Sequence, residues 1–168
     1  MKKILSFLIL IVTLASCTIR FDRFPSNVKT DFPEEMRGKY LFTNRQEKDS
    51  TYVTITSNTI KFSDDKILRS GGLSDTIKLA KGKSYYYLCF GDSVKNRFIW
   101  DVYPMKTVGK KLYFFALDAD YYKKPIKKYF KPISGFEDLY EMDEAKLDLF
   151  CKKKLKNKTA VKLIKVNP

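Results

Sequence analysis

The sequence predicts a mainly β protein, with an antiparallel meander of about eight strands that forms a barrel or a half-open sheet and a C-terminal helix before the last strand. Short segments alternate apolar and polar residues with period two, turn residues separate them, and one late segment has helical periodicity. Aromatic residues make up 15% of the 168-residue chain. That content excludes a disordered chain and provides a core for one domain.

The first residues have the pattern of an export signal. Two lysines precede an apolar run over 4–14 that is too short to span a bilayer. The run ends at Leu14-Ala15-Ser16-Cys17, which resembles the lipobox of bacterial lipoproteins. The resemblance implies that a signal peptide of residues 1–16 is removed and that Cys17 is acylated, which would anchor the chain to a membrane. The alternative is an ordinary signal peptide that contains a cysteine.

Residues 17–32 are predicted to be a lipidated tether, because Pro25 and Pro33 interrupt helices and the segment lacks periodicity. A single β-rich domain is then expected over 33–168. Thr18 follows Cys17 where an aspartate marks inner-membrane retention in the lipoproteins that the motif resembles. The resemblance therefore implies a cell-envelope location at the outer membrane, facing the periplasm.

The domain is predicted to open with a helical turn at 33–38 and to continue as short strands. These are expected at Lys39–Thr43, Thr51–Thr56, Thr59–Ser63, Ser74–Ala80, Ser84–Phe90, Arg97–Tyr103 and Lys111–Asp118. Turn residues between consecutive strands favour antiparallel pairing of neighbours. The segments 85–90 and 112–117 are apolar on both faces, so a helix, another sheet or a membrane is expected to cover the second face.

The covering helix is predicted to begin after Asp143, whose side chain can cap it, and to end at Asn157. Its apolar face comprises Leu147, Phe150, Cys151 and Leu155. A final strand is expected over Thr159–Val166. Capping-box spacing from Ser134 to Glu137 predicts a further short helix.

The strand count and order over Gly38–Val166 resemble a lipocalin-like or calycin-like barrel. Gly38-Lys39-Tyr40 stands where lipocalins carry Gly-x-Trp, with Tyr in place of Trp. The resemblance implies an interior that takes a small apolar molecule. A half-open sheet packed on the helix is the alternative architecture.

The formal net charge is +14, which favours anionic partners. Export argues against nucleic acid and leaves anionic lipid, an acidic glycan or an acidic protein. The densest basic stretch, 120–136, interleaves aromatic residues with Lys123, Lys124, Lys127, Lys128 and Lys131, and its prolines are expected to prevent a regular helix. We expect these lysines to contact an anionic surface. The alternative is a connection whose aromatics pack inward and whose lysines are solvated.

The chain contains no histidine, which excludes Ser-His-Asp and Cys-His relays and zinc sites that need imidazole. The carboxylate pairs Asp64-Asp65 and Asp118 with Asp120 fall at predicted turns, where solvated aspartates are common. Asp118 and Asp120 have the spacing of calcium-loop ligands, but the following lysines and the lack of a following Gly and Glu argue against that site. We therefore expect no cofactor, no metal and no enzymatic activity. A carboxylate-dependent envelope hydrolase is the less favoured alternative.

Two cysteines remain besides Cys17. Cys89 lies on a predicted central strand and Cys151 on the inward face of the helix, so they either form a disulfide or remain buried thiols. Together with these patterns, the two resemblances imply a lipid-anchored, non-catalytic binding lipoprotein with an apolar ligand in a lipocalin-like barrel. The alternative is a protein-binding accessory, inhibitor or immunity lipoprotein that uses its basic surface. The oligomeric state is left open.

Overall fold

The computed structural model describes residues 18–42, 51–63, 70–157 and 160–166. The elements are β1 (Arg20–Phe21), β2 (Val28–Lys29), the 3-10 helix η1 (Glu34–Met36), β3 (Gly38–Phe42), β4 (Thr51–Ile55), β5 (Thr59–Phe62), β6 (Gly71–Gly72), β7 (Ile77–Lys81), β8 (Tyr86–Val94), β9 (Arg97–Val108), β10 (Lys111–Phe114), α2 (Ala119–Ile126), β11 (Leu139–Tyr140), α3 (Glu144–Lys154) and β12 (Val161–Val166). The predicted mainly β class is confirmed.

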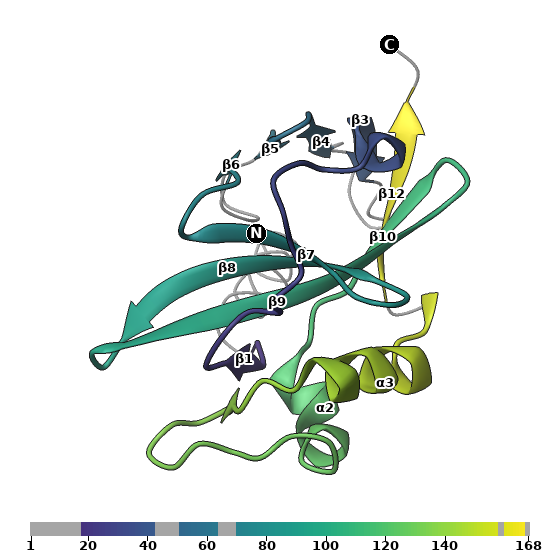
Figure 1. The fold of residues 1–168 in the computed structure, drawn as a ribbon. Helices are drawn as coiled ribbons and strands as arrows, with labels where there is room; N and C mark the ends of the chain where they lie inside the picture. The colour runs from purple at the N-terminus through teal and green to yellow at the C-terminus, as the bar shows by residue number, and fades with distance from the viewer. Residues whose placement is uncertain (1–17, 43–50, 64–69, 158–159, 167–168) are drawn as a thin grey trace, which may run out of the picture.

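In the described part of the chain, one curled sheet runs in the order β2-β7-β8-β9-β10-β12-β3-β4-β5-β6. Its curvature forms a half-barrel, with β3 to β6 at one end and the helices at the other (Figure 1). The last strand joins two meanders, because Leu163 of β12 lies opposite Leu112 of β10 and also opposite Phe42 of β3. The half-open sheet, left as an alternative by the sequence, is therefore the architecture of the described residues.

Most predicted strands are present with shifted ends, and four two-residue strands were not predicted: β1, β2, β6 and β11. The predicted strand Lys111–Asp118 is too long, since β10 ends at Phe114. The helix predicted from Ser134 to Glu137 is wrong. Gly135 there has a φ of 82°, a left-handed conformation that suits a turn and not a helix.

The central strands are buried on both faces, as predicted. Tyr87 and Cys89 of β8 belong to a core between the sheet and the helices. Leu88 and Phe90 belong to a second core inside the curl of the sheet. This alternation follows from the opposite directions of successive side chains in a strand. The side chain of Tyr40 in the second core is 1% exposed, so packed residues fill the described inner face.

The helix predicted after Asp143 is confirmed as α3, although it ends at Lys154 and not at Asn157. The carboxylate of Asp143 accepts a hydrogen bond from the backbone N–H of Lys146 at 3.0 Å, which caps the first turn and lowers the pKa of Asp143. On the inward side, Leu147, Phe150 and Cys151 are fully buried. Figure 1 shows α2 and α3 together below the sheet, where they cover the convex side of the central strands.

The predicted tether is wrong for its described residues, 18–32. Strand β1 pairs with β9 and with β11, and the side chains of Ile19, Phe21 and Phe32 have no exposed surface. The segment is too short to show periodicity, but its apolar side chains reach both cores. The described fold therefore includes Thr18 and the residues after it, and Cys17 lies outside the described residues.

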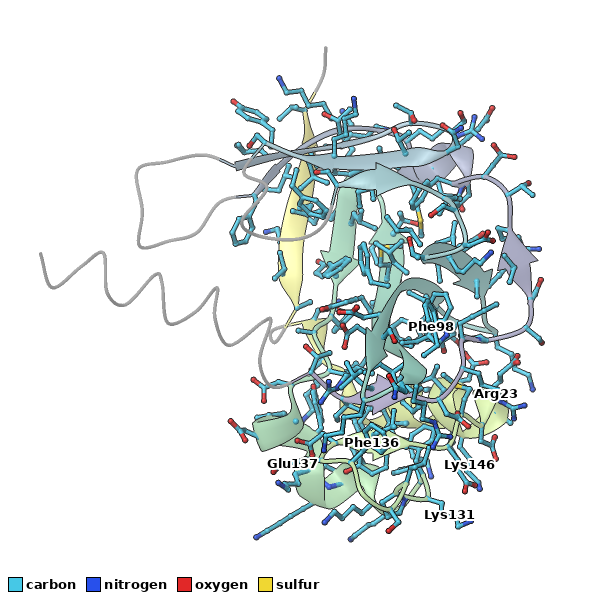
Figure 2. All side chains as sticks on the ribbon, turned by 90° about the vertical axis from the view of Figure 1, so that its left-hand side faces the viewer. Arg23, Phe98, Lys131, Phe136, Glu137 and Lys146 are labelled. Carbon is cyan, nitrogen blue, oxygen red and sulfur yellow. The ribbon has the colours of Figure 1, made fainter. Side chains whose placement is uncertain are left out.

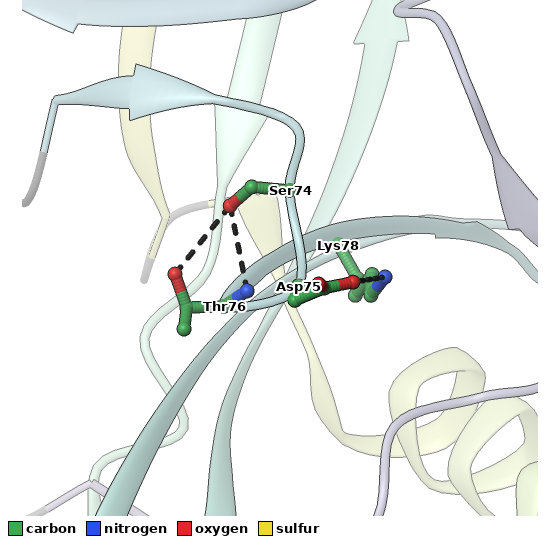
Figure 3. A network of polar contacts seen from close by, with 4 residues as sticks. All are labelled: Ser74, Asp75, Thr76 and Lys78. Carbon is green, nitrogen blue, oxygen red and sulfur yellow. Dashed lines mark hydrogen bonds and ion pairs between the residues drawn. The ribbon is translucent and has the colours of Figure 1, made fainter.

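A polar network fixes the connection from β6 to β7 (Figure 3). The hydroxyl of Ser74 accepts a hydrogen bond from the N–H of Thr76 at 3.4 Å and also contacts its hydroxyl. Lys78 pairs with Asp75 at 3.3 Å. These local contacts turn the chain into β7, the strand whose far end carries the turn described below.

Candidate functional surface

The lysine-rich stretch begins as a regular helix, α2, contrary to the prediction from its prolines. Asp118 caps it: one carboxylate oxygen accepts from the N–H of Tyr121 at 3.0 Å, and its carbonyl accepts from Tyr122 at 2.9 Å. Pro125 lies in the last turn. In so short a helix, the proline removes the single bond that its missing N–H would have made to the carbonyl of Tyr121. Tertiary packing offsets that loss.

The packing separates the aromatic residues of this stretch from its lysines. Tyr122, Ile126 and Phe130 are buried, and the ring of Tyr122 meets Phe150 of α3 edge-on at 5.5 Å. Tyr121 is 66% exposed and is the exception. The alternative of inward-packed aromatics describes Tyr122, Tyr129 and Phe130, whereas Tyr121 is exposed and Phe136 is half-buried outside both cores.

Two of the five predicted lysines are paired. Lys123 contacts Glu137 at 3.3 Å, and Lys131 contacts Glu141 at 2.8 Å. Each hydrogen bond to a carboxylate raises the pKa of its lysine. Both pairs are exposed, so they add little to stability and are screened by salt.

The other three lysines of this stretch are exposed and have no ion pair among the described residues. Lys124 lies on α2, and Lys127 and Lys128 lie in the turn that follows it. We call Lys124, Lys127 and Lys128 the basic surface. Its positive charge is not neutralised by neighbouring carboxylates of the described chain, as a surface for an anionic partner requires.

Two further cations, which the sequence analysis did not predict, add positive charge at this end of the molecule. Lys95 and Arg97, at the tip of the β8–β9 hairpin, lie over the ring of Phe136 at 5.5 and 5.9 Å. Phe136 is adjacent to Glu137, the partner of Lys123. Figure 2 shows Phe136, Glu137 and Lys131 together at the helical end of the molecule. The sequence places the hairpin tip some forty residues away, so no local pattern could have found this contact.

Cys89 and Cys151 are buried free thiols in the core between the sheet and the helices. The disulfide that the sequence left open is not formed in the structure. Burial raises the pKa of both Cys89 and Cys151, and the thiol of Cys89 donates to the carbonyl of Tyr87 at 3.6 Å. Inert, buried thiols of this kind act as small apolar side chains.

The carboxylates considered for catalysis do not act as a pair in the described structure. Asp118 caps α2 while Asp120 points to solvent, and Asp64-Asp65 lies outside the described residues. Within the described ranges, no group of three or more metal-ligating side chains gathers. No helix in those ranges has the length and apolar character needed to cross a bilayer.

One backbone contact connects the predicted anchor to α2. Thr18, the residue after Cys17, forms an antiparallel bridge with Asp118, and the N–H of Ile19 donates to the carbonyl of Leu117 at 2.8 Å. Thr18 is thus held at the residue that caps α2. No protein-family model, curated protein or solved structure matches the chain, so its function is inferred from its own chemistry.

Proposed function

We propose that the protein is a lipid-anchored, non-catalytic envelope protein that holds its basic surface against an anionic membrane. The single observation that carries this proposal is the bridge between Thr18 and Asp118. The lipobox predicts an anchor on Cys17, the neighbour of Thr18. The bridge places that neighbour beside the first turn of α2.

The distances involved are short. A residue spans at most about 3.6 Å of chain, so the acylated residue would lie within about 4 Å of Thr18 along the backbone. Lys127 is nine residues beyond Asp118, which is about 14 Å at the helical rise of 1.5 Å per residue. An anchor at Cys17 would therefore keep the basic surface near the headgroups, whereas a flexible tether of 17–32 would not.

Electrostatics would add to the acyl anchor. A lysine near an anionic surface contributes about 1 kcal/mol, so Lys124, Lys127 and Lys128 together contribute about 3 kcal/mol. That is about a hundredfold in membrane affinity. The exposed ring of Tyr121 between the anchor and the lysines suits the headgroup region, where amphipathic aromatic side chains collect.

The other predicted functions have less support from the geometry. Packed side chains occupy the described inner face of the sheet, so the apolar ligand inside a barrel remains a prediction from the sequence. An acidic protein or an acidic glycan would also bind a surface of this charge. The bridge supports the membrane as partner, because Thr18, the residue that follows the predicted anchor, lies beside the helix that carries Lys124.

The first test is acylation. The Cys17→Ser variant of the full chain should lose acyl labelling and membrane fractionation. Retention of both would remove the anchor from the proposal.

The second test uses that unacylated variant with vesicles that contain anionic phospholipid. Changing Lys124, Lys127 and Lys128 to Glu should weaken vesicle binding by about a hundredfold or more, and 1 M salt should weaken it similarly. A matched control changes Lys61, Lys110 and Lys111 to Glu, which are exposed lysines of β5, of the β9–β10 turn and of β10 and lie outside the basic surface. Equal losses in both variants, or no vesicle binding before substitution, would contradict a membrane-facing basic surface. The latter result would favour an acidic protein partner.

A further inference from the structure

The helices cover only part of the outer face of the sheet. The core between the sheet and the helices takes buried residues from β1, β7, β8 and β9, and none from β3, β4, β5 or β12. Figure 1 shows β3, β4 and β5 at the end of the half-barrel away from α2 and α3. The outer face of these strands is therefore a sheet surface that no described helix covers.

Strand register identifies the side chains on this uncovered face. Leu41 of β3 lies opposite Ile164 of β12 and also opposite Tyr52 of β4, so three neighbouring strands present one apolar row. The adjacent residues Tyr40 and Leu163 are buried in the core inside the curl of the sheet, so the row points outward. Tyr52 is 37% exposed, and Leu41 and Ile164 are half-buried.

Exposed lysines border the apolar row. Lys111 of β10 lies opposite Ile164 and continues the row. Lys39 and Lys162 each stand two residues from a member of the row, on the same face of β3 and of β12. The ammonium group of Lys39 lies over the ring of Tyr52, 4.2 Å from its centroid. We call Leu41, Tyr52 and Ile164 together with Lys39, Lys111 and Lys162 the outer-face patch.

The charge around this patch is of one sign. The strands β3, β4, β5, β10 and β12 contain no Asp or Glu. Among the residues that the structure describes, Lys39, Lys111 and Lys162 form no ion pair. A second copy of the chain would bring the same positive charge and be repelled, whereas an anionic partner is complementary.

The apolar centre favours a protein among the anionic partners. Lys39 already occupies one face of the Tyr52 ring, and Leu41 and Ile164 are aliphatic, so the patch lacks an open aromatic platform for sugar rings. An apolar centre with a polar rim is the usual anatomy of a protein interface. The row spans two strand spacings, about 10 Å, which matches the roughly 10–12 Å diameter of a helix.

We propose that the outer-face patch docks an acidic amphipathic helix of a partner protein. Apolar side chains of that helix cover Leu41, Tyr52 and Ile164, and carboxylates on its flanks pair with the three lysines. The outer-face patch shares no residue with the basic surface. The helix contact therefore goes beyond the proposed membrane contact, and each can fail without the other.

The test titrates the full-length Cys17→Ser chain by calorimetry with a synthetic helical peptide that carries leucines on one face and glutamates on both flanks. Changing Lys39, Lys111 and Lys162 to Glu should weaken binding by about tenfold or more, because each change replaces an attraction with a repulsion. The matched control changes Lys124, Lys127 and Lys128 to Glu and should alter binding by less than about threefold. Leu41→Thr keeps a strand-forming residue and should weaken binding by about fivefold, because it removes apolar contact. Matched melting temperatures show that each variant is folded.

A second measurement locates the contact without any substitution. Carbodiimide coupling of the peptide glutamates, mapped by mass spectrometry, should join them to Lys39, Lys111 or Lys162. Coupling confined to Lys124, Lys127 and Lys128 would overturn the proposal.

Further probes separate the helix from other anionic partners. A peptide with serine in place of leucine, polygalacturonate and phosphatidylglycerol vesicles should each bind independently of Lys39, Lys111 and Lys162. Dependence of polygalacturonate or vesicle binding on these lysines, with no binding of the leucine peptide, would assign a glycan or lipid and overturn the helix. Equal losses in the two lysine variants, or undiminished binding by Leu41→Thr, would also overturn it.

Discussion

The contact between Asp148 of α3 and Tyr87 of β8 should be among the most costly polar contacts to remove. The tyrosine hydroxyl donates to Asp148 at 2.6 Å, and the backbone N–H of Lys83 reaches the two carboxylate oxygens at 3.2 and 3.1 Å. Tyr87 is 1% exposed, and burial raises the pKa of its phenol above the ordinary value. One carboxylate therefore joins the helix layer to the turn between β7 and β8.

The expected cost follows from these contacts. A hydrogen bond to a charged group contributes about 1.5–3 kcal/mol, and a buried hydroxyl left without a partner costs about 1–3 kcal/mol. Partial exposure of Asp148 lets water replace some of the loss. Asp148→Ala should therefore lower the free energy of unfolding by about 2–4 kcal/mol. Tyr87→Phe removes both the hydroxyl and its need for a partner, so it should cost only about 1 kcal/mol.

Urea unfolding of the single and double variants measures this coupling. The double variant should be more stable than the sum of the single effects predicts, by about 1 kcal/mol or more, because the two groups interact directly. Glu141→Ala is the control: it breaks an exposed ion pair of 2.8 Å with Lys131 and should cost less than about 1 kcal/mol. Additive effects, or a cost for Asp148→Ala no larger than that of the control, would refute the reasoning.

Three further predictions concern the same region. Gly82→Ala should destabilise the fold by about 1–3 kcal/mol in urea unfolding, because the added Cβ would lie 2.5 Å from both Asp148 and Tyr87; a neutral effect would show that the turn can shift. Stability should fall as pH rises above about 8.5, since the folded state retains protons on Cys89, Cys151 and Tyr87 that the unfolded chain releases. Each group contributes a slope of about 1.4 kcal/mol per pH unit above its unfolded pKa, so a flat profile to pH 10 in reductant would contradict the burial of the two cysteines. Denatured, unreduced Cys17→Ser protein should label at two thiols, and labelling at none would establish the disulfide instead.

Several elements could be predicted because their causes are local. The alternation in Thr51–Ile55 and the two apolar faces of 85–90 predicted strands and their burial, and both are present. Asp143 followed by an apolar face predicted α3 and its cap. In these segments, side-chain spacing and backbone capping agree with the tertiary packing, so the sequence was a sufficient guide.

Other features depend on contacts between distant segments. Ile19 and Phe21 look like part of a tether until β9 and β11 are present to pair with β1. Pro125 predicts a break, but burial of Tyr122 and Ile126 against α3 stabilises the helix around it. The lysines of 123–131 divide in the same way: their positions follow from the sequence, whereas their ion pairs depend on distant segments.

The sequence by itself determined the strand-rich class, the positive charge, the absence of histidine chemistry and the lysines at 123–131. Only the tertiary structure decided which lysines are paired, since Glu137 and Glu141 meet them through a loop whose path has no local signature. It also decided that Thr18 adjoins Asp118. The physical reason is that strand register and helix docking come from burying apolar surface across the whole chain, which no short window of sequence contains.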